Sequence, residues 1–376
     1  MLRRIAVAAG VIAVGLEVTL RAWPQLCPAQ EQLKIAETTG FDAFVDDSLL
    51  GARPQPLVRE TVHTADYRYA VALDSLGFPN HEPWPSHPDI AVLGNSLAVG
   101  PGVGMDGQFT TLMQRALAGR SVLNLGLPGG SPAQELRIYQ AYLRALHPRV
   151  VIATVWVASD VDNATQFAHW RSEGAPPDFT AYRERFGTTH GGRTELKRIR
   201  DALSRSYLLR AVYYAGRGLV RSDSLTGQVN FPDGEMLLLS VRAQRRLARG
   251  ATRADVALAS DFIRPLSTLR AAADSDGARF VVVLLPSKEE IYGATTFPAV
   301  LATVRDVRAA LSAAGLPMLD LYSLFRARGS ERPPFYEHDI HFNAYGNQLV
   351  AQALDAWIVD SVPSTPHTPR SGAGGG

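Results

Sequence analysis

Three residues in this chain have the types needed for serine nucleophile chemistry. Ser96 follows a short apolar segment, residues 90–93, and a glycine, Gly94, that permits a sharp turn. Asp339 and His341 stand two positions apart near the C-terminal end. A serine hydroxyl is a weak nucleophile until a base takes its proton, and a carboxylate can hold that base in place. The sequence therefore predicts Ser96 as nucleophile, His341 as base and Asp339 as the group that orients it.

A second histidine, His338, lies in the same segment and competes for the role of base. Residues two apart on an extended segment project to the same side, so Asp339 and His341 would face one way and His338 the other. We therefore expect His341 to contact Ser96. For either histidine taken alone, the simpler interpretation is a surface turn.

Two further polar segments follow apolar runs and could stabilise negative charge on an ester oxygen. They are residues 124–131, which include Gly129, and residues 156–163, which include Ser159. Ligands bind at the carboxyl ends of the strands in an open parallel sheet, so both segments should lie beside Ser96. A glycine such as Gly129 can bring its N–H close to a substrate oxygen. Taken alone, each segment could instead be a simple turn between a strand and a helix.

The elements that must position these residues follow a regular order from residue 89 onward. Short apolar runs predict strands at residues 89–93, 121–125, 150–157, 280–285 and 317–321. Apolar residues with helical spacing predict helices at 108–117, 132–146, 262–273 and 297–314, and a final helix capped by Asn343. This alternation predicts a three-layer α/β/α fold with a central, mostly parallel sheet.

The rest of the chain divides around this domain, which we expect to span residues 89–362. Residues 24–88 are rich in proline and predict an irregular lead-in. Residues 164–260 lack a clear strand pattern and predict a helical insertion, with helices at 195–220 and 235–249. Ordinary covering helices are the alternative there. Residues 363–376 predict a disordered tail.

The N-terminal residues 1–23 carry information about location. Arg3 and Arg4 precede an apolar run at residues 5–16. A basic start before a run of this length is typical of a signal-peptide core or a short membrane anchor. We expect an uncleaved anchor with the following domain outside the cytoplasm, in the periplasm or at the cell surface. A cleaved signal and a buried helix of a soluble protein are the alternatives.

Composition excludes several classes of function. The chain has 376 residues, of which 46% are hydrophobic and 20% are charged, which suffices for one large α/β domain. A net charge of +2 gives no basic surface for nucleic acid. The single cysteine, Cys27, excludes an internal disulfide framework and a cysteine-rich metal site. The chemistry of Ser96 calls for neither a metal nor a cofactor.

Taken together, these blocks resemble those of the SGNH or GDSL-type hydrolases over residues 66–358. Gly94-Asn95-Ser96-Leu97 is similar to the family's nucleophile block, with asparagine where aspartate is usual. Residues 124–129 and 158–160 resemble its second and third blocks, and Asp339 with His341 resembles its last. Residues 74–78 and 286–288 are similar to the membrane-anchored branch of the group, which is related to alginate-acetylation proteins.

The resemblance implies an oxyanion site made by the backbone N–H groups of Ser96 and Gly129. Ser159 stands where the family has an asparagine that donates a side-chain N–H, and serine has a shorter reach. Losing one such donor typically lowers the rate by about 10²–10³, or about 3–4 kcal/mol. Asn163, one helical turn further on, is a substitute candidate.

The sequence thus predicts an exported, membrane-anchored esterase or O-acyltransferase. Its substrates would be ester-linked acyl groups, chiefly acetyl, on a cell-surface glycan, with lipid esters as the next candidate. The alternative, prompted by Ser159, is a catalytically weak or inactive component that binds glycan. A nucleotide site at residues 100–104 is a further alternative, but these residues lack the glycine spacing and the lysine that such sites require. A catalytic pair of Ser96 with Lys288 is another.

Overall fold

The computed structural model describes most of the chain outside a few segments. The described residues are 2–23, 41, 43–64, 66–117, 119–183, 206–209, 212, 228–232, 234–239, 258–293 and 299–361. The predicted tail at 363–376 and most of the two helices predicted at 195–220 and 235–249 lie outside them.

A five-stranded sheet forms the centre of the molecule, and every pairing within it is parallel. The strand order is β11-β10-β7-β5-β6. The strands are β5 (Ile90–Gly94), β6 (Val122–Gly126), β7 (Val150–Val155), β10 (Arg279–Leu284) and β11 (Met318–Asp320). Both β5 and β7 are buried along their whole length, which explains their almost uninterrupted apolar sequences.

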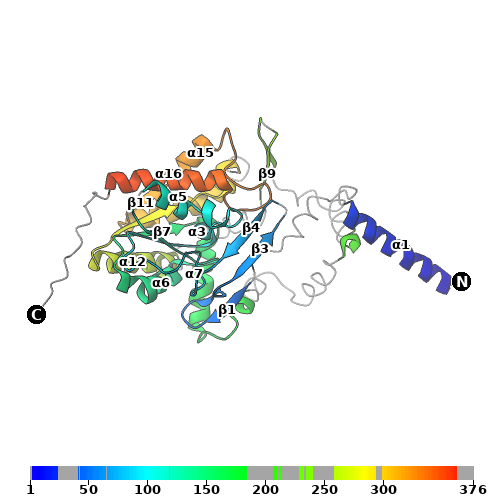
Figure 1. Cartoon of the computed structure of the whole chain (residues 1–376), viewed down its shortest axis with the longest axis horizontal. Coiled ribbons are helices and arrows are strands. Elements are labelled where there is room, and N and C mark those ends of the chain that lie inside the picture. The colour runs from blue at the N-terminus through cyan, green and yellow to red at the C-terminus, as the bar shows by residue number, and fades with distance from the viewer. Residues whose placement is uncertain are drawn as a thin grey trace, which may run out of the picture.

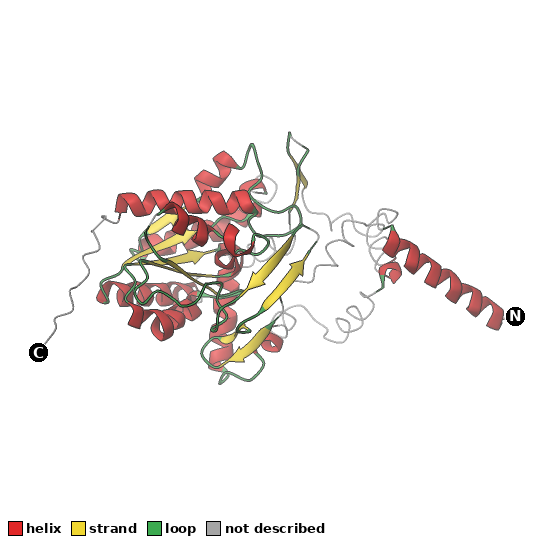
Figure 2. Cartoon of the chain, viewed as in Figure 1, coloured by secondary structure: helices red, strands yellow, loops and turns green. Residues whose placement is uncertain are grey.

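Helices cover both faces of this sheet, which confirms the predicted three-layer α/β/α fold (Figures 1 and 2). On one face α5 (Phe109–Ala116) packs against α16 (Ala344–Ser361), and on the other α6 (Pro132–Ile138) packs against α12 (Arg264–Ser275). Further helices among the described residues include α3 (Ser96–Val99), α4 (Gly104–Gly107), α7 (Val157–Ser172), α13 (Lys288–Tyr292), α14 (Ala299–Ala313) and α15 (Tyr322–Arg328).

Two predicted elements end differently from expectation. The strand predicted at 150–157 stops at Val155, because α7 already begins at Val157. The helix predicted at 132–146 is α6 followed by a π-helical turn at Tyr139–Leu143 and a 3-10 turn at Arg144–Leu146. Residues 258–263, ahead of α12, likewise form a π-helical turn.

The prediction of an irregular lead-in is wrong for residues 44–72, which form two antiparallel hairpins. One consists of β1 (Phe44–Asp47) and β2 (Gly51–Pro54), and the other of β3 (Arg59–His63) and β4 (Arg68–Ala72). In β3 only Val62 is buried, so the strand is polar in sequence and gives no apolar run. Within the predicted helical insertion, β8 (Gln228–Asn230) and β9 (Met236–Leu238) form a third hairpin, which contradicts the absence of strands expected there.

The N-terminal segment is helical, as α1 (Leu2–Ala22). Across the ranges described above, no helix combines the length and the apolar character needed to cross a membrane.

Candidate active site

The fold brings Ser96, His341 and Asp339 into contact. His341 Nε2 lies 2.8 Å from Ser96 Oγ, and His341 Nδ1 lies 2.5 Å from Asp339 Oδ1. The two ring nitrogens of His341 therefore contact the serine and the carboxylate at the same time. A neutral imidazole in this position can accept the serine proton on Nε2 while its Nδ1–H donates to the aspartate.

Ser96 stands at the first position of α3, directly beyond the end of β5. Asn95 caps this short helix, because its Oδ1 accepts a hydrogen bond of 2.8 Å from the Leu97 N–H. Gly94 is needed for close approach: a Cβ there would lie 1.8 Å from Thr154 Oγ1. The glycine thus lets the neighbouring strand β7 pack directly against the turn that presents the serine.

The segment with Asp339 and His341 is a bend rather than the extended strand expected from its spacing. The backbone N–H of His341 turns back and donates to Asp339 Oδ1 at 2.9 Å, while Nδ1 contacts the same oxygen. The structure therefore places His341, and not His338, against Ser96, as expected. The reason given from the sequence was wrong, because it assumed an extended segment in which residues two apart face the same side. We call residues 336–341 the histidine loop.

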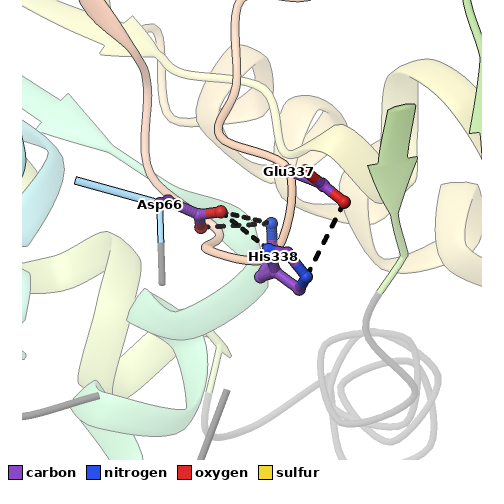
Figure 3. A group of neighbouring side chains, drawn as sticks. All are labelled: Asp66, Glu337 and His338. Carbon is purple, nitrogen blue, oxygen red and sulfur yellow. Dashed lines mark hydrogen bonds and ion pairs between the residues drawn. The ribbon is translucent and has the colours of Figure 1, made fainter. Parts of the chain in front are cut away.

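His338 belongs to a separate cluster with Asp66 and Glu337 (Figure 3). His338 Nδ1 lies 2.7 Å from Asp66 Oδ1, and the backbone N–H groups of His338 and Asp339 both donate to Asp66 Oδ2, at 3.1 and 2.7 Å. Glu337 Oε1 is 3.7 Å from His338 Nε2. The three side chains are close enough to hold a metal ion, but the oxygens of Asp66 already accept these N–H groups. The cluster accordingly fastens the histidine loop to the β3–β4 hairpin.

Lys288 holds the other side of the histidine loop. Its side chain is fully buried, and Nζ donates to the carbonyl oxygens of Asp339, Glu337 and Tyr336 at 2.8, 3.2 and 3.3 Å. Burial lowers the pKa of Lys288, although nearby carboxylates oppose that shift. Since His341 is the group that contacts Ser96, the structure gives Lys288 a role in the loop and gives the serine–lysine pair no support.

Tyr67, between β3 and β4, donates from Oη to Asp339 Oδ2 at 2.8 Å. Burial alone would raise the pKa of Asp339, but the charge of His341 and hydrogen bonds from His341 and Tyr67 outweigh it. The pKa of Asp339 consequently lies below its usual range, so the carboxylate stays ionised beside His341.

The backbone N–H groups of Ser96 and Gly129 form the candidate oxyanion site. Among the residues that the structure describes, neither N–H donates to a protein acceptor. Gly129 has a φ of +69°, which favours glycine, and a Cβ there would lie 2.5 Å from Arg183 Nη1. The Arg183 guanidinium therefore covers the backbone of this loop.

The two further oxyanion candidates from the sequence make hydrogen bonds elsewhere. Ser159 Oγ donates to Asp160 Oδ1 at 3.0 Å. Asn163 Nδ2 donates to the Gly130 carbonyl at 3.1 Å, and its Oδ1 accepts from Arg183 Nη2 at 2.9 Å. Both side chains thus support the surrounding loops, and their part in binding an oxyanion stays a prediction.

Asp160 links the nucleophile turn to α7. Its Oδ1 accepts from Asn95 Nδ2 at 2.7 Å, and its Oδ2 accepts from the Trp156 N–H at 2.8 Å. The side chain is fully buried, and burial outweighs these hydrogen bonds and raises the pKa of Asp160 to about 7. Asparagine at position 95 supplies an N–H to this buried carboxyl group, which an aspartate at the same position would not do.

Reasoning from the sequence missed Asp66, Tyr67 and Arg183. The first two lie 272 or more positions before their partners in the histidine loop, and the third follows α7 in the predicted insertion. No local spacing signals such contacts.

A known family matches the C-terminal part of the chain, which includes Asp339 and His341. Residues 248–371 match a family model described as "SGNH hydrolase-like domain, acetyltransferase AlgX". This match confirms the resemblance seen in the sequence and supports an SGNH-type hydrolase or acyltransferase. A search of curated proteins finds no match.

Several solved structures are similar to this chain at low identity. An acetyl xylan esterase, AlAXEase, is 12% identical with a TM-score of 0.38, over 72% of this chain and 100% of that one. An extracellular lipase from Streptomyces rimosus is 14% identical with a TM-score of 0.40, over 72% and 99%. A lipase/acylhydrolase from Enterococcus faecalis is 12% identical with a TM-score of 0.35, over 72% and 94%.

Proposed function

We propose that this protein is a serine esterase or O-acyltransferase that forms an acyl-enzyme on Ser96. The observation that carries the proposal is the 2.8 Å contact between His341 Nε2 and Ser96 Oγ, with Asp339 on the opposite ring nitrogen. This arrangement has the parts required to activate a hydroxyl nucleophile near neutral pH.

In the proposed reaction Ser96 Oγ attacks the ester carbonyl carbon while His341 Nε2 takes the hydroxyl proton. The developing oxyanion accepts hydrogen bonds from the N–H groups of Ser96 and Gly129. When the tetrahedral intermediate collapses, the bond to the leaving alcohol breaks and His341 returns the proton to that alcohol. Water or an acceptor hydroxyl then attacks the acyl-enzyme by the same route and yields hydrolysis or transfer.

Arg183 is the group that we propose to offset the missing asparagine at position 159. Its guanidinium lies over Gly129, so its charge faces the same loop as one oxyanion donor. A fixed positive charge near a developing oxyanion stabilises the transition state through space, without a direct hydrogen bond.

We propose acylated glycan, with acetyl as the expected acyl group, as the natural substrate, and a site of action outside the cytoplasm. The matched acetyltransferase family supports the acyl chemistry, and the basic start followed by an apolar run supports export. Membrane attachment through residues 1–23 remains part of this proposal. Fractionation of cells that produce the full chain tests it, because recovery in the cytoplasmic fraction would contradict export.

A catalytically weak, glycan-binding component is the second candidate. The Ser159 hydroxyl donates to Asp160, so the third oxyanion donor of the family has no direct counterpart at that position. Such a protein would bind acetylated oligosaccharide equally well in wild type and Ser96→Ala, without releasing acetate.

The experiment that separates the two candidates measures acetate release and acetyl transfer from an acetylated oligosaccharide by the purified full chain. We expect Ser96→Ala to lower the rate by at least about a thousandfold with unchanged folding. Activity that survives in Ser96→Ala would refute the mechanism.

A further inference from the structure

A cavity of about 230 Å³ lies directly beside Ser96 and His341. Its walls are mainly apolar and come from parts of the chain far apart in sequence. They include Val62, Tyr69, Val71, Val99, Met105 and Pro128. The cavity thus begins at the nucleophile and continues between the sheet edge and the β3–β4 hairpin.

The β3–β4 hairpin supplies the wall that the α/β core does not. Val62 and Val71 are buried, and together with Leu73 they form an apolar cluster separate from the main core. Tyr69, opposite Val62 in the hairpin register, packs against this cluster. The hairpin also carries Asp66 and Tyr67, which hold the histidine loop, so one element shapes the cavity and fixes the base.

Three polar side chains that line the cavity make hydrogen bonds to other protein groups. Tyr67 donates to Asp339, His341 contacts both Ser96 and Asp339, and Gln108 accepts from Asn124. Sugar hydroxyls need free donors and acceptors along the wall that receives them, because an unpaired polar group is costly to bury. An apolar group fits these walls better than a sugar ring.

We propose that this cavity binds the acyl chain of the substrate, and that a straight chain of about four to eight carbons is preferred over acetyl. This keeps the proposed acyl-enzyme mechanism on Ser96 and replaces acetyl as the expected acyl group. The inference rests on the proposed function, since the chain enters the cavity as the ester carbonyl reaches Ser96 Oγ. A cavity of about 230 Å³ is several times the ~30 Å³ that one water molecule occupies in the liquid, so an acetyl methyl would leave most of it unfilled.

The chemistry remains that of the acyl-enzyme. The bond between the longer acyl group and its alcohol breaks, an ester to Ser96 Oγ forms, and the proton passes through His341 to the leaving alcohol. Water or an acceptor hydroxyl then releases the chain, so no further reactant is required.

The test compares kcat/KM of the full chain for p-nitrophenyl esters from acetate to dodecanoate. Each methylene that enters the cavity should raise kcat/KM about fourfold, up to the length that fills it, after which the gain should stop. Equal or faster turnover of acetate relative to hexanoate would overturn the proposal.

Two substitutions at the half-buried Met105 on α4 form a matched pair for the same assay. Met105→Trp should shorten the preferred chain and Met105→Ala should lengthen it. An unchanged length preference in both folded variants would contradict the assignment of the cavity. If Met105→Trp fails to fold, Met105→Ala and wild type still give a comparison.

Labelling of Ser96 with alkyl fluorophosphonates separates this proposal from the proposed function. Faster labelling by an octyl than by an ethyl probe supports both. Labelling with no preference for the longer alkyl group overturns the cavity assignment and leaves the nucleophile intact. No labelling by either probe, together with no ester turnover, overturns both.

Discussion

Tyr67 Oη donates a hydrogen bond of 2.8 Å to Asp339 Oδ2, which joins the β3–β4 hairpin to the carboxylate that holds His341. The other oxygen of Asp339 contacts His341. Through this hydrogen bond the hairpin holds Asp339, and Asp339 in turn orients His341, the proposed base. The Tyr67 hydroxyl itself bonds neither Ser96 nor the substrate. Tyr67 is a positioning residue in this account.

Tyr67→Phe should lower kcat by about tenfold, because a buried hydrogen bond to a charged group contributes about 1.5–3 kcal/mol and part of this orients His341. The Tyr67 hydrogen bond also helps to lower the pKa of Asp339. Its loss should raise that pKa and move the acid limb of the kcat–pH profile toward higher pH. Steady-state kinetics across pH measures both effects.

Tyr292→Phe is the matched control for this experiment. Tyr292 is also part-buried and donates one 2.8 Å hydrogen bond, to the Gly329 carbonyl. The control should lose stability to a similar degree but keep the wild-type pH profile. If the two variants have the same profile, the positioning role of Tyr67 is wrong.

Lys288→Met should destabilise the fold by about 2–4 kcal/mol, because three carbonyl oxygens of the histidine loop lose a buried donor. The loop should also become less well held, so backbone amides at residues 336–341 should exchange faster with deuterium. Denaturant unfolding and hydrogen exchange measure the two effects. Unchanged exchange in this loop would show that Lys288 does not hold it.

Ser159→Ala should change kcat by less than about threefold, because the hydroxyl donates to Asp160 rather than toward the oxyanion site. A true oxyanion donor would instead cost about 10²–10³ in rate. Kinetics with one ester substrate distinguishes the two outcomes. A fall of a hundredfold in a folded variant would mean that Ser159 turns toward the oxyanion in the complex.

Asp160 should make the protein less stable as pH rises from about 4 to about 7. Burial raises the pKa of Asp160 in the folded state to about 7, from an ordinary value of 3.8, so the unfolded chain releases this proton first. Ionisation of the unfolded state then favours unfolding over this interval, by an amount on the order of a few kcal/mol.

Asp160→Asn removes the ionisable group at this position. The free energy of unfolding should then depend less on pH between about 4 and about 7. Denaturant unfolding at several pH values measures the slope in both proteins. Glu290 is buried with a pKa raised to about 7 as well, and it is present in both. The difference between the two proteins therefore reports the removal of the Asp160 charge, which includes its smaller contribution to the raised pKa of the buried Glu135. Equal slopes would contradict the ionisation proposed for Asp160.

The central sheet could be predicted because its strands are buried on both faces. The run Val-Val-Ile-Ala-Thr-Val in β7 is apolar almost throughout, and the same holds for β5 and β10. Ser96, Asp339 and His341 were predictable because their residue types and their order match one kind of chemistry. Local sequence and general sheet topology were sufficient for this part.

The contacts that hold the site could not be predicted, because they join segments far apart in sequence. In β3 a single buried valine stands among exposed polar residues, so its sequence resembles a loop. Asp66, Tyr67 and Lys288 gain their roles only when the histidine loop folds against them. The bend at His341 also depends on a local hydrogen bond to Asp339, which residue spacing alone does not reveal.

The central claim is that His341 activates Ser96, and the most direct measurement is covalent labelling of the purified full chain by a fluorophosphonate, with the modified residue identified by mass spectrometry. We predict rapid labelling of Ser96 that is lost in His341→Ala and retained in His338→Ala. No labelling of the folded wild type, or equal labelling in His341→Ala, would contradict the account.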